Sequence, residues 1–344
     1  VEKRSKVRSR IVADQLVKLI KEADHVVIMG HRMSDLDAIG AAEGVLRICK
    51  ICDVPAVIAV KRDATLAGSL IDALCRAGQR DDFIDPKEAL PIISKQTLCV
   101  VVDTYQVGLV ESKEILEKCG KVAVIDHHRK GVGYIENPAL VCHEPYSSSA
   151  SELVTELLQY VGERDDKPNR VEAEGLLAGI LLDTQDFTLH TGVRTFEAAA
   201  ALRRYGAETE RVRRLFDVTM VEYNAKADLV EKAQMYKNCA ISVGGEIAPE
   251  ARVAIAQAAN DLLRIQGVDA SFVAVQVSGG VNISARSLGA VNVQVIMESL
   301  GGGGHQTMAA AQLKHITPEA VRSRIETAID NYWASQKKSS AAEK

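Results

Sequence analysis

The stretch HVVIMGHRMSDLDAIGAAEGVLRICK, residues 25–50, sets the architecture of the chain. It begins with a β-branched run at 25–29 that stops at Gly30, which is typical of a short buried strand. From about residue 38 the apolar residues recur with helical spacing. The loop between them carries the pattern H-x-x-x-D-x-D, formed by His31, Asp35 and Asp37. The stretch therefore predicts a strand–loop–helix unit with metal-ligating side chains in its loop.

The same alternation of strand and helix continues on both sides of this stretch. Predicted strands lie at 25–29, 55–60, 98–102 and 121–125. Predicted helices lie at 11–23, 38–50, 66–77, 113–119, 148–161 and 171–182. Because the strands are apolar throughout and alternate with helices, they indicate βαβ units and a parallel sheet that helices cover on both faces. The first half of the chain is therefore predicted to be an α/β domain.

The pattern changes in the second half, which is predicted to hold a connector and a smaller domain. Residues 195–237 are rich in Arg, Glu and Ala, and they predict helices with no strand. The segments that follow predict strands at 240–243, 272–277, 281–286 and 309–313, and helices at 251–264, 292–300 and from 318 onwards. This mixture is typical of an α+β domain. We therefore expect a parallel-sheet domain at 11–194, a helical connector at 195–237 and a second domain at 238–334.

Composition and charge argue against two classes of protein, those that bind long nucleic acid and those that span a membrane. The formal net charge of −4 argues against broad electrostatic binding of long nucleic acid. No apolar run approaches the roughly 20 residues that a membrane-spanning helix needs. The seven cysteines are odd in number and lack disulfide-like spacing, which favours a reducing, cytoplasmic compartment. Since the first residue is Val, we expect the chain to be a piece of a longer protein.

Residues that can bind metal follow the predicted strands. One group follows the first strand, one residue ends the third strand, and a triplet ends the fourth: these are His31, Asp35 and Asp37, then Asp103, then Asp126, His127 and His128. A further carboxylate, Asp183, ends an apolar helical run. Because ligands of open α/β sheets bind at the carboxyl ends of the strands, these groups are expected to converge at one edge.

The residue types indicate a site for two divalent ions. Carboxylates suit hard ions, and imidazole extends the choice to Mn, Fe, Co or Zn. The two carboxylates of the D-x-D pattern can serve different ions, and two ions can clamp the attacking and leaving oxygens of a phosphoryl transfer. No Cys lies in the cluster, which argues against a closed structural zinc site. The predicted metal residues are His31, Asp35, Asp37, Asp103, His127 and Asp183.

Each part of this set also has a purely structural interpretation. A D-x-D pattern in a loop is usually turn chemistry, and an Asp after a strand commonly caps a helix. Adjacent histidines can be surface residues. The four parts together, in this order along the chain, favour the metal site over these alternatives.

At this point the sequence resembles the DHH phosphoesterase superfamily, named for the triplet that Asp126, His127 and His128 form here. The motifs that carry the resemblance are GHRMSDLDAIGAA (30–42), VVDT (101–104), VIDHHR (124–129), LLAGILLDTQDF (176–187) and GGGGHQTMAAA (301–311). The last is similar to the glycine-rich motif of the DHH-associated C-terminal domain. Within the superfamily, the chain is most similar to the GdpP-type cyclic di-AMP phosphodiesterases, whose lead-in the segment 2–11 also resembles.

The resemblance implies roles for individual residues. His31, Asp35 and Asp103 would hold one ion. Asp37, Asp103, His127 and Asp183 would hold the other, so that Asp103 bridges two ions that are usually Mn(II) in the family. Catalytic roles would fall to Asp103, Asp126 and His128, with His128 contacting phosphate and Asp126 setting the tautomer of a neighbouring histidine.

The second domain and Arg129, which directly follows the triplet, are expected to bind substrate. Glycines let a backbone approach a phosphate closely, although four glycines alone are more often a flexible loop. By resemblance, the SAR segment in the strand near 284 lines the nucleotide pocket. The expected substrate contacts are Arg129, Ser284, Arg286, Gly302, Gly303, Gly304 and His305.

The resemblance implies a hydrolase that cuts cyclic di-AMP to linear pApA with two divalent ions, and a longer parent protein anchored at the membrane. One departure concerns residues 105–108, YQVG, where the family leads us to expect a more basic, Pro-containing stretch. Two alternatives stay open: a nanoRNase-like or RecJ-like nuclease acting on short oligonucleotides or pApA, and a nucleotide-binding regulator without catalysis. Whether the chain forms a homodimer also stays open.

Overall fold

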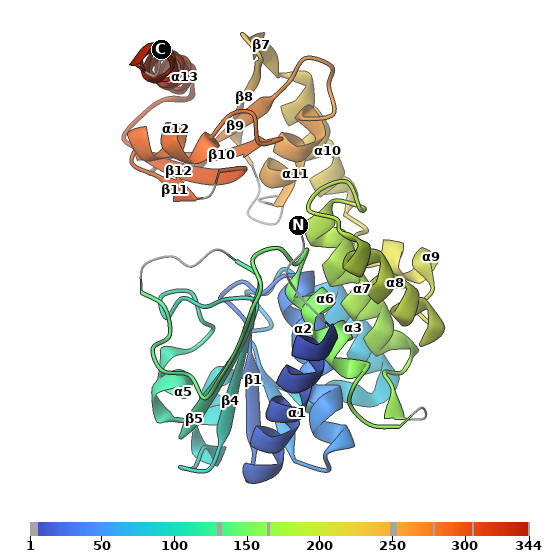
Figure 1. Cartoon of the computed structure of the whole chain (residues 1–344). Coiled ribbons are helices and arrows are strands. Elements are labelled where there is room, and N and C mark those ends of the chain that lie inside the picture. The colour runs from blue at the N-terminus through green and yellow to red at the C-terminus, as the bar shows by residue number, and fades with distance from the viewer. Residues whose placement is uncertain are drawn as a thin grey trace. The chain divides into compact units, whose positions relative to one another are not determined.

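The computed structural model describes residues 6–128, 133–163, 166–247, 253–277, 279–304 and 306–342. The chain divides into two compact units, Val1–Asp217 and Val218–Lys344 (Figure 1). Each unit has its own sheet of six strands. Within the described ranges, none of the helices combines the length and the apolar character that a membrane span requires.

The first unit is built on a parallel sheet with the strand order β3-β2-β1-β4-β5-β6. Its strands are β1 (Val26–Met29), β2 (Ala56–Ala59), β3 (Phe83–Ile84), β4 (Leu98–Val102), β5 (Lys121–Asp126) and β6 (Leu140–His143). The chain moves from β1 outward to β2 and β3, and then returns to the other side of β1 for β4. The reversal makes the gap between β1 and β4 the switch point, where an open α/β sheet binds its ligands.

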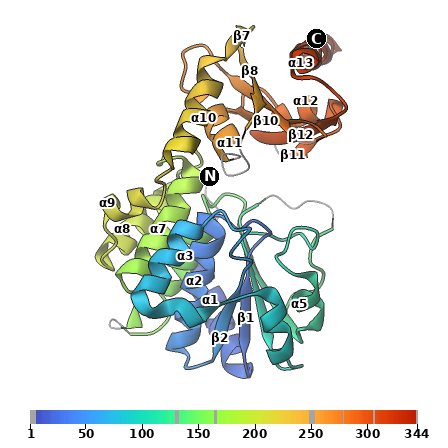
Figure 2. The ribbon, with the colours of Figure 1, turned by 180° about the vertical axis from the view of Figure 1, so that it is seen from behind.

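Helices cover both faces of this sheet, as the apolar strands predicted. They are α1 (Lys6–Glu22), α2 (Leu36–Ile51), α3 (Gly68–Leu74), α4 (Pro86–Ala89), α5 (Lys113–Lys118), α6 (Ala150–Leu158), α7 (Arg170–Thr184), α8 (Val193–Arg204) and α9 (Thr209–Arg214). The larger core lies between the sheet and α1, α2, α3, α6 and α7, and a smaller one lies under α4 and α5 on the opposite face. Figure 2 shows the same helices from behind.

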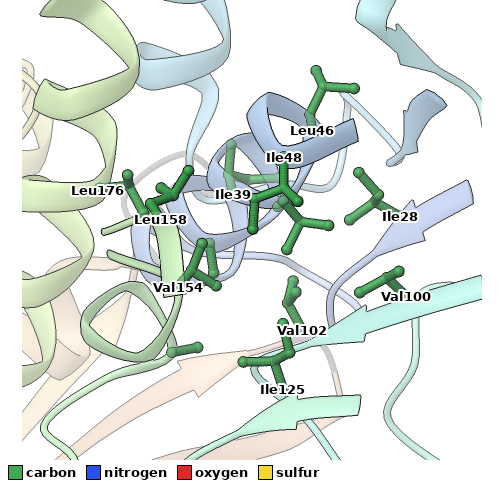
Figure 3. Packing of buried hydrophobic residues seen from close by; sticks show 14 of the residues in the cluster. Ile28, Ile39, Leu46, Ile48, Val100, Val102, Ile125, Val154, Leu158 and Leu176 are labelled. Carbon is green, nitrogen blue, oxygen red and sulfur yellow. The ribbon is translucent and has the colours of Figure 1, made fainter. Parts of the chain in front are cut away.

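Alternate residues of each strand belong to these two cores, because successive side chains point to opposite faces of a sheet. In β4, Val100 belongs to the larger core and Val101 to the smaller one. Figure 3 shows Val100, Val102 and Ile125 pointing from the strands toward Ile39 on α2. Each such fully buried aliphatic side chain contributes roughly 1.5–3 kcal/mol. This packing holds α2, and the residues at its start, over the carboxyl edge of the sheet.

The second unit is a mixed sheet between two helical layers. Its strands, β7 (Gln234–Tyr236), β8 (Cys239–Glu246), β9 (Ala270–Val277), β10 (Gly280–Ser287), β11 (Gly303–Gly304) and β12 (Met308–Lys314), follow the order β11-β12-β10-β9-β8-β7. Only the pair β8–β9 is parallel within the described residues. The helices are α10 (Met220–Glu231), α11 (Val253–Leu262), α12 (Val293–Ser299) and α13 (Pro318–Ala342). One core lies under α12 and α13, and the other under α10 and α11.

The predicted fold class is confirmed, a parallel-sheet α/β unit followed by a smaller α+β unit, but three details differ. The segment 195–237 was expected to lack strands, and it contains β7. Its helices are shared between the units, because α8 and α9 pack into the core of the first unit while α10 packs on α11 in the second. The short edge strands β3, β6 and β11 were not predicted, because runs of two to four residues carry little periodicity.

Candidate metal centre

The six predicted metal residues meet at the carboxyl edge of the first sheet. His31 follows β1, and Asp35 is the N-cap residue of α2 with Asp37 in the first turn of that helix. Asp103 follows β4, His127 follows β5, and Asp183 lies in the last turn of α7. The strand ends and the helix termini thus bring together residues up to 152 positions apart in the sequence.

Asp103 lies between two groups of ligand atoms. Its Oδ2 atom lies 3.4 Å from His31 Nε2, which in turn lies 3.8 Å from Asp35 Oδ1. Its Oδ1 atom lies 3.3 Å from His127 Nε2. The two oxygens of this single carboxylate therefore face different histidines.

The group around His127 also includes two further carboxylates. His127 Nε2 lies 3.0 Å from Asp183 Oδ2 and 3.9 Å from Asp37 Oδ2. Three sets of side chains offer ligand atoms within 4.8 Å of one another: His31, Asp35 and Asp103; Asp37, Asp103, His127 and Asp183; and Asp103, His127 and His128. The first two sets are the groups that the resemblance implied.

The backbone of Asp103 turns sharply after β4. Its φ angle is 58°, in the left-handed region that Asp tolerates better than most residues. Its amide N–H donates to the carbonyl of Ile125 over 2.9 Å, which ties the turn to β5. This conformation turns the chain at the strand end, where the carboxylate lies between His31 and His127.

Asp37 is fully buried and is held by the start of α6. Its carboxylate accepts the backbone N–H groups of Ala150 and Ser151 over 2.7 and 2.8 Å. The N-terminus of a helix favours negative charge because its first N–H groups have no partner within the helix. Helix α7 approaches the same carboxylate at Gly179, where an added Cβ would lie 2.7 Å from Asp37 Oδ1.

The residues fit a divalent cation on chemical grounds. Asp103 Oδ1 and His127 Nε2 are buried and have no hydrogen-bond partner, although buried polar atoms are nearly always paired. Both are atoms that coordinate Mn, Fe, Co or Zn. Four carboxylates and two imidazoles in one partly buried cluster form a donor set that one or two ions can satisfy.

The pKa shifts in the cluster reflect the crowding of the carboxylates. Burial opposes the charge on His31, but the carboxylates of Asp103 and Asp35 outweigh it and raise the pKa of the imidazole to about 11. Burial, followed by the nearby charges of Asp103 and Asp183, raises the pKa of Asp37. Burial also opposes the charge on Asp103, yet the nearby imidazoles of His127 and His31 lower the pKa of that carboxyl. The cluster therefore attracts positive charge.

The other two residues of the triplet lie beside the cluster. Asp126 Oδ1 lies 2.9 Å from His128 Nδ1 and accepts the backbone N–H of His128 over 3.1 Å. A carboxylate can only accept, so Nδ1 of His128 carries a hydrogen and Nε2 points elsewhere. Asp126 thus fixes the tautomer of His128.

The expected substrate residues lie in the second unit or outside the described ranges. Arg129 and His305 belong to the residues that the structure does not describe. Ser284 and Arg286 share one face of β10, and Arg286 Nη1 donates to Ser284 Oγ over 3.1 Å. Arg286 Nε is buried without a hydrogen-bond partner.

The glycine run has a clear structural role. An added Cβ at Gly302 would lie 2.1 Å from the carbonyl oxygen of Ala310, and one at Gly304 would lie 2.4 Å from Met308. Gly303 pairs with Ala310, which pairs in turn with Ser284 on the other side of β12. The glycines therefore let β11 lie in the same sheet as the Ser284–Arg286 segment.

One residue near the cluster, His143, was not among the site residues predicted from the sequence. His143, at the end of β6, donates from Nε2 to the carbonyl oxygen of His128 over 2.5 Å, and its ring contacts the ring of Tyr105. The available signal was a polar residue directly after the apolar run 139–142, which is the pattern that identified Asp103. Because this run is short, no strand was predicted there, and His143 was therefore not predicted as a site residue.

Two family profiles match the chain. Residues 25–180 match the DHH family, N-terminal domain, and residues 248–334 match the DHHA1 domain. The cyclic-di-AMP phosphodiesterase GdpP of Geobacillus thermodenitrificans is 45% identical over 338 residues, which cover 97% of this chain and 51% of that protein. The cyclic-di-AMP phosphodiesterase PdeA of Listeria monocytogenes is 40% identical with the same coverage. The chain thus spans about half the length of these curated relatives.

A solved structure shows the same fold at low sequence identity. The exopolyphosphatase-related protein of Bacteroides fragilis is 21% identical, has a TM-score of 0.80, and is matched over 95% of this chain and 98% of its own. Together with the ordered motifs and the two matching profiles, this agreement leads to one assignment. The chain contains a DHH N-terminal domain followed by a DHHA1 domain.

Proposed function

We propose that the chain is a two-metal phosphodiesterase that hydrolyses cyclic di-AMP to linear pApA. The observation that supports this most strongly is the position of Asp103, whose two carboxylate oxygens face His31 and His127 separately. One carboxylate shared between two ligand groups is the arrangement that a pair of divalent ions requires. The names of the relatives GdpP and PdeA supply the substrate.

The two ligand groups give each ion its own donors. His31, Asp35 and Asp103 would hold the first ion, and Asp37, Asp103, His127 and Asp183 the second. Mixed imidazole and carboxylate donors suit Mn(II), which we propose as the ion. When bound, such a pair supplies an activated water and neutralises the charge that develops on phosphate.

The side chains around the ions would contact the phosphate and keep the reacting groups in place. Water adds to one phosphorus, the bond from that phosphorus to the 3′-oxygen breaks, and the oxygen leaves as a hydroxyl, so the ring opens to pApA. Nδ1 of His128 lies 2.9 Å from Asp126 Oδ1, and we assign the contact with a phosphate oxygen to Nε2 of the same ring. Asp126 keeps that imidazole in one tautomer throughout.

Substrate binding is proposed for the DHHA1 domain and for the residues next to the triplet. The unpaired, buried Nε of Arg286 supports this, because a guanidinium with a free donor can bind a phosphate or a base edge. Ser284 and the glycines 302–304 lie on neighbouring strands of the same sheet. Arg129 and His305 remain proposed contacts from their sequence positions. We also propose a cytoplasmic location.

The proposal is tested by a turnover panel. Cyclic di-AMP, cyclic di-GMP, pApA and a ten-residue oligoadenylate are each incubated with the chain and Mn(II), with a chelated sample as control. We expect cyclic di-AMP to be cleaved fastest, to pApA, and only with the metal present. Preferred cleavage of pApA or of the oligomer would instead identify a nuclease, and tight binding without turnover would identify a regulator.

A further inference from the structure

We propose that His143 and Tyr105 form a brace that holds the turn of His127 and His128 against the turn of Asp103. His143 is then a positioning residue for the proposed reaction, acting through the backbone of the triplet. The inference rests on the proposed function, since it concerns the same metal centre. It involves Tyr105, which lies in the segment where this chain departs from the family pattern.

The end of β6 places His143 beside the triplet. Strand β6 pairs in parallel with β5, and His143 lies opposite Asp126 in the register. The next residue, Glu144, donates its backbone N–H to the carbonyl of Asp126 over 3.0 Å. The backbone pairing between β6 and β5 therefore extends to Asp126, the first residue of the triplet, and ends there.

The side chain of His143 extends this contact to the third residue of the triplet. Its Nε2 atom lies 2.5 Å from the carbonyl oxygen of His128. A carbonyl can only accept a hydrogen bond, so Nε2 of His143 must carry the hydrogen. This bond holds the carbonyl group of His128, beyond the point where the backbone pairing of β5 with β6 ends.

Tyr105 connects the same imidazole to the other half of the site. The ring centroids of Tyr105 and His143 lie 5.7 Å apart at an interplanar angle of 63°, an edge-on contact. Tyr105 is only 5% exposed and lies two residues after Asp103. Its carbonyl accepts the N–H of Ile135 over 2.9 Å, which fixes its backbone. One imidazole thus contacts the turns after β4 and after β5.

The brace matters because the ligand groups on these two turns must keep a fixed separation. Asp103 comes from the first turn and His127 from the second, and their ligand atoms lie 3.3 Å apart. A catalytic constellation tolerates displacements of only about 0.5 Å. The sheet aligns the two strands, but the ligand atoms lie beyond the strand ends, where the side-chain contacts of His143 add to the backbone hydrogen bond of Asp103 and to the contact between Asp126 and His128.

The test uses three variants and one control in the whole chain. His143→Leu removes the hydrogen bond, Tyr105→Leu removes the ring contact, and His143→Gln keeps a donor near the position of Nε2. The control, His25→Leu, removes a partly buried imidazole that precedes β1, at the opposite edge of the sheet. For each we measure kcat and KM on cyclic di-AMP, Mn(II) affinity by calorimetry, and hydrogen exchange of the segment 124–128.

We expect His143→Leu to lower kcat or Mn(II) affinity about 10–100-fold, as removal of a group supporting a metal ligand does, with KM nearly unchanged. Exchange at 124–128 should rise in His143→Leu and Tyr105→Leu, and His143→Gln should recover most of the loss. His25→Leu should match the wild type. An additional double variant, His143→Leu with Tyr105→Leu, should lose less than the product of the two single losses, because both side chains belong to one brace.

Several outcomes would overturn the brace. Wild-type kcat, Mn(II) affinity and exchange in a folded His143→Leu chain would do so, and so would a His143→Gln chain as impaired as His143→Leu. If His143→Leu fails to fold, the same measurements on Tyr105→Leu test the brace, and wild-type values in that variant would contradict it. A wild-type chain that cleaves nothing in the substrate panel would count against the proposed function alone, because Mn(II) affinity and exchange report the brace without turnover.

Discussion

The Oδ1 atom of Asp103 lies 3.3 Å from the Nε2 atom of His127, and both atoms are buried without a hydrogen-bond partner. The two residues follow neighbouring parallel strands, in which Val102 pairs with Ile125. This register sets Asp103 level with Asp126, and His127, the next residue, lies one position farther along at the same carboxyl edge. Since the other oxygen of Asp103 faces His31, this carboxylate connects the two halves of the candidate metal centre.

Replacing Asp103 with Asn is expected to abolish turnover. Asn tolerates the left-handed backbone but cannot bring negative charge to two ions, so several kcal/mol of transition-state stabilisation are lost, a fall in kcat of roughly 1,000-fold or more. Asp53→Asn is a matched control, because Asp53 has the same φ of 58° at an exposed position after α2. Steady-state kinetics on cyclic di-AMP check both. An Asp103→Asn chain with wild-type kcat would refute the bridging role.

Adding Mn(II) is expected to stabilise the chain, because an ion relieves the repulsion among Asp37, Asp103 and Asp183. At a metal concentration of 100 times the dissociation constant, the gain is about 2.7 kcal/mol, or a rise in Tm on the order of 5–10 °C. Differential scanning calorimetry with and without chelator measures it. The Asp103→Asn chain should show little of the rise, and an equal rise in both chains would place the bound ion elsewhere.

The predictable part of the site came from strand ends. The runs 98–102 and 121–125 are apolar and bounded by polar residues, so they predict buried parallel strands, and the rule for ligand positions in such sheets then selects Asp103 and His127. The same rule could have selected His143. It failed there because β6 lies at the edge of the sheet, where only Leu140 and Cys142 of its four residues are buried.

The backbone contacts that position the metal-binding side chains could not be predicted from the sequence. Asp37 is held by the backbone of Ala150 and Ser151, more than a hundred residues away, and backbone donors leave no signal in residue types. The segment 195–237 was misjudged for a related reason. Whether a helix connects two units or packs on one of them depends on which face is buried, and α8 buries Ala198 and Leu202 in the first core.

Gly179→Ala is expected to impair both stability and metal binding. The added methyl would lie 2.3 Å from Ser151 Oγ and 2.8 Å from Asp37 Cα, so α7 must move away from α2 and carry Asp183 with it. Such overpacking costs about 1–3 kcal/mol. Gly68→Ala is the matched control, because an added Cβ there meets nothing within 4 Å. Urea unfolding and Mn(II) titration of both variants check the prediction, and a Gly179→Ala chain with wild-type Mn(II) affinity would contradict it.

Glu43 makes the stability of the first unit depend on pH. It is fully buried between α2 and α7, and Gln79 Nε2 donates to its Oε1 over 2.5 Å and to Glu172 Oε1 over 2.9 Å. Arg47 pairs with Glu172, which leaves Glu43 without a cation of its own in this cluster. Burial, followed by the charge of Glu172, raises the pKa of Glu43 to about 8.

Protonation of Glu43 would also add a hydrogen-bond donor to this cluster. Glu43 Oε2 and Gln79 Oε1 are both buried without a partner, and one hydrogen on the acid can join two such acceptors. Because the folded pKa lies above the unfolded value of about 4.5, the folded chain binds more protons between these values. The contribution of Glu43 to stability is therefore complete below about pH 4.5 and is lost as pH rises through about 8.

Glu43→Gln should remove this part of the pH dependence, since an amide mimics the protonated acid at every pH. Near pH 9 the variant should be more stable than the wild type, by an amount on the order of 4 kcal/mol if the full shift is expressed. Urea unfolding from pH 5 to pH 9 measures the difference, and Glu117→Gln, at an exposed position on α5, controls for loss of a carboxylate. Parallel stability curves for Glu43→Gln and the wild type would show that Glu43 is ionised in the folded chain.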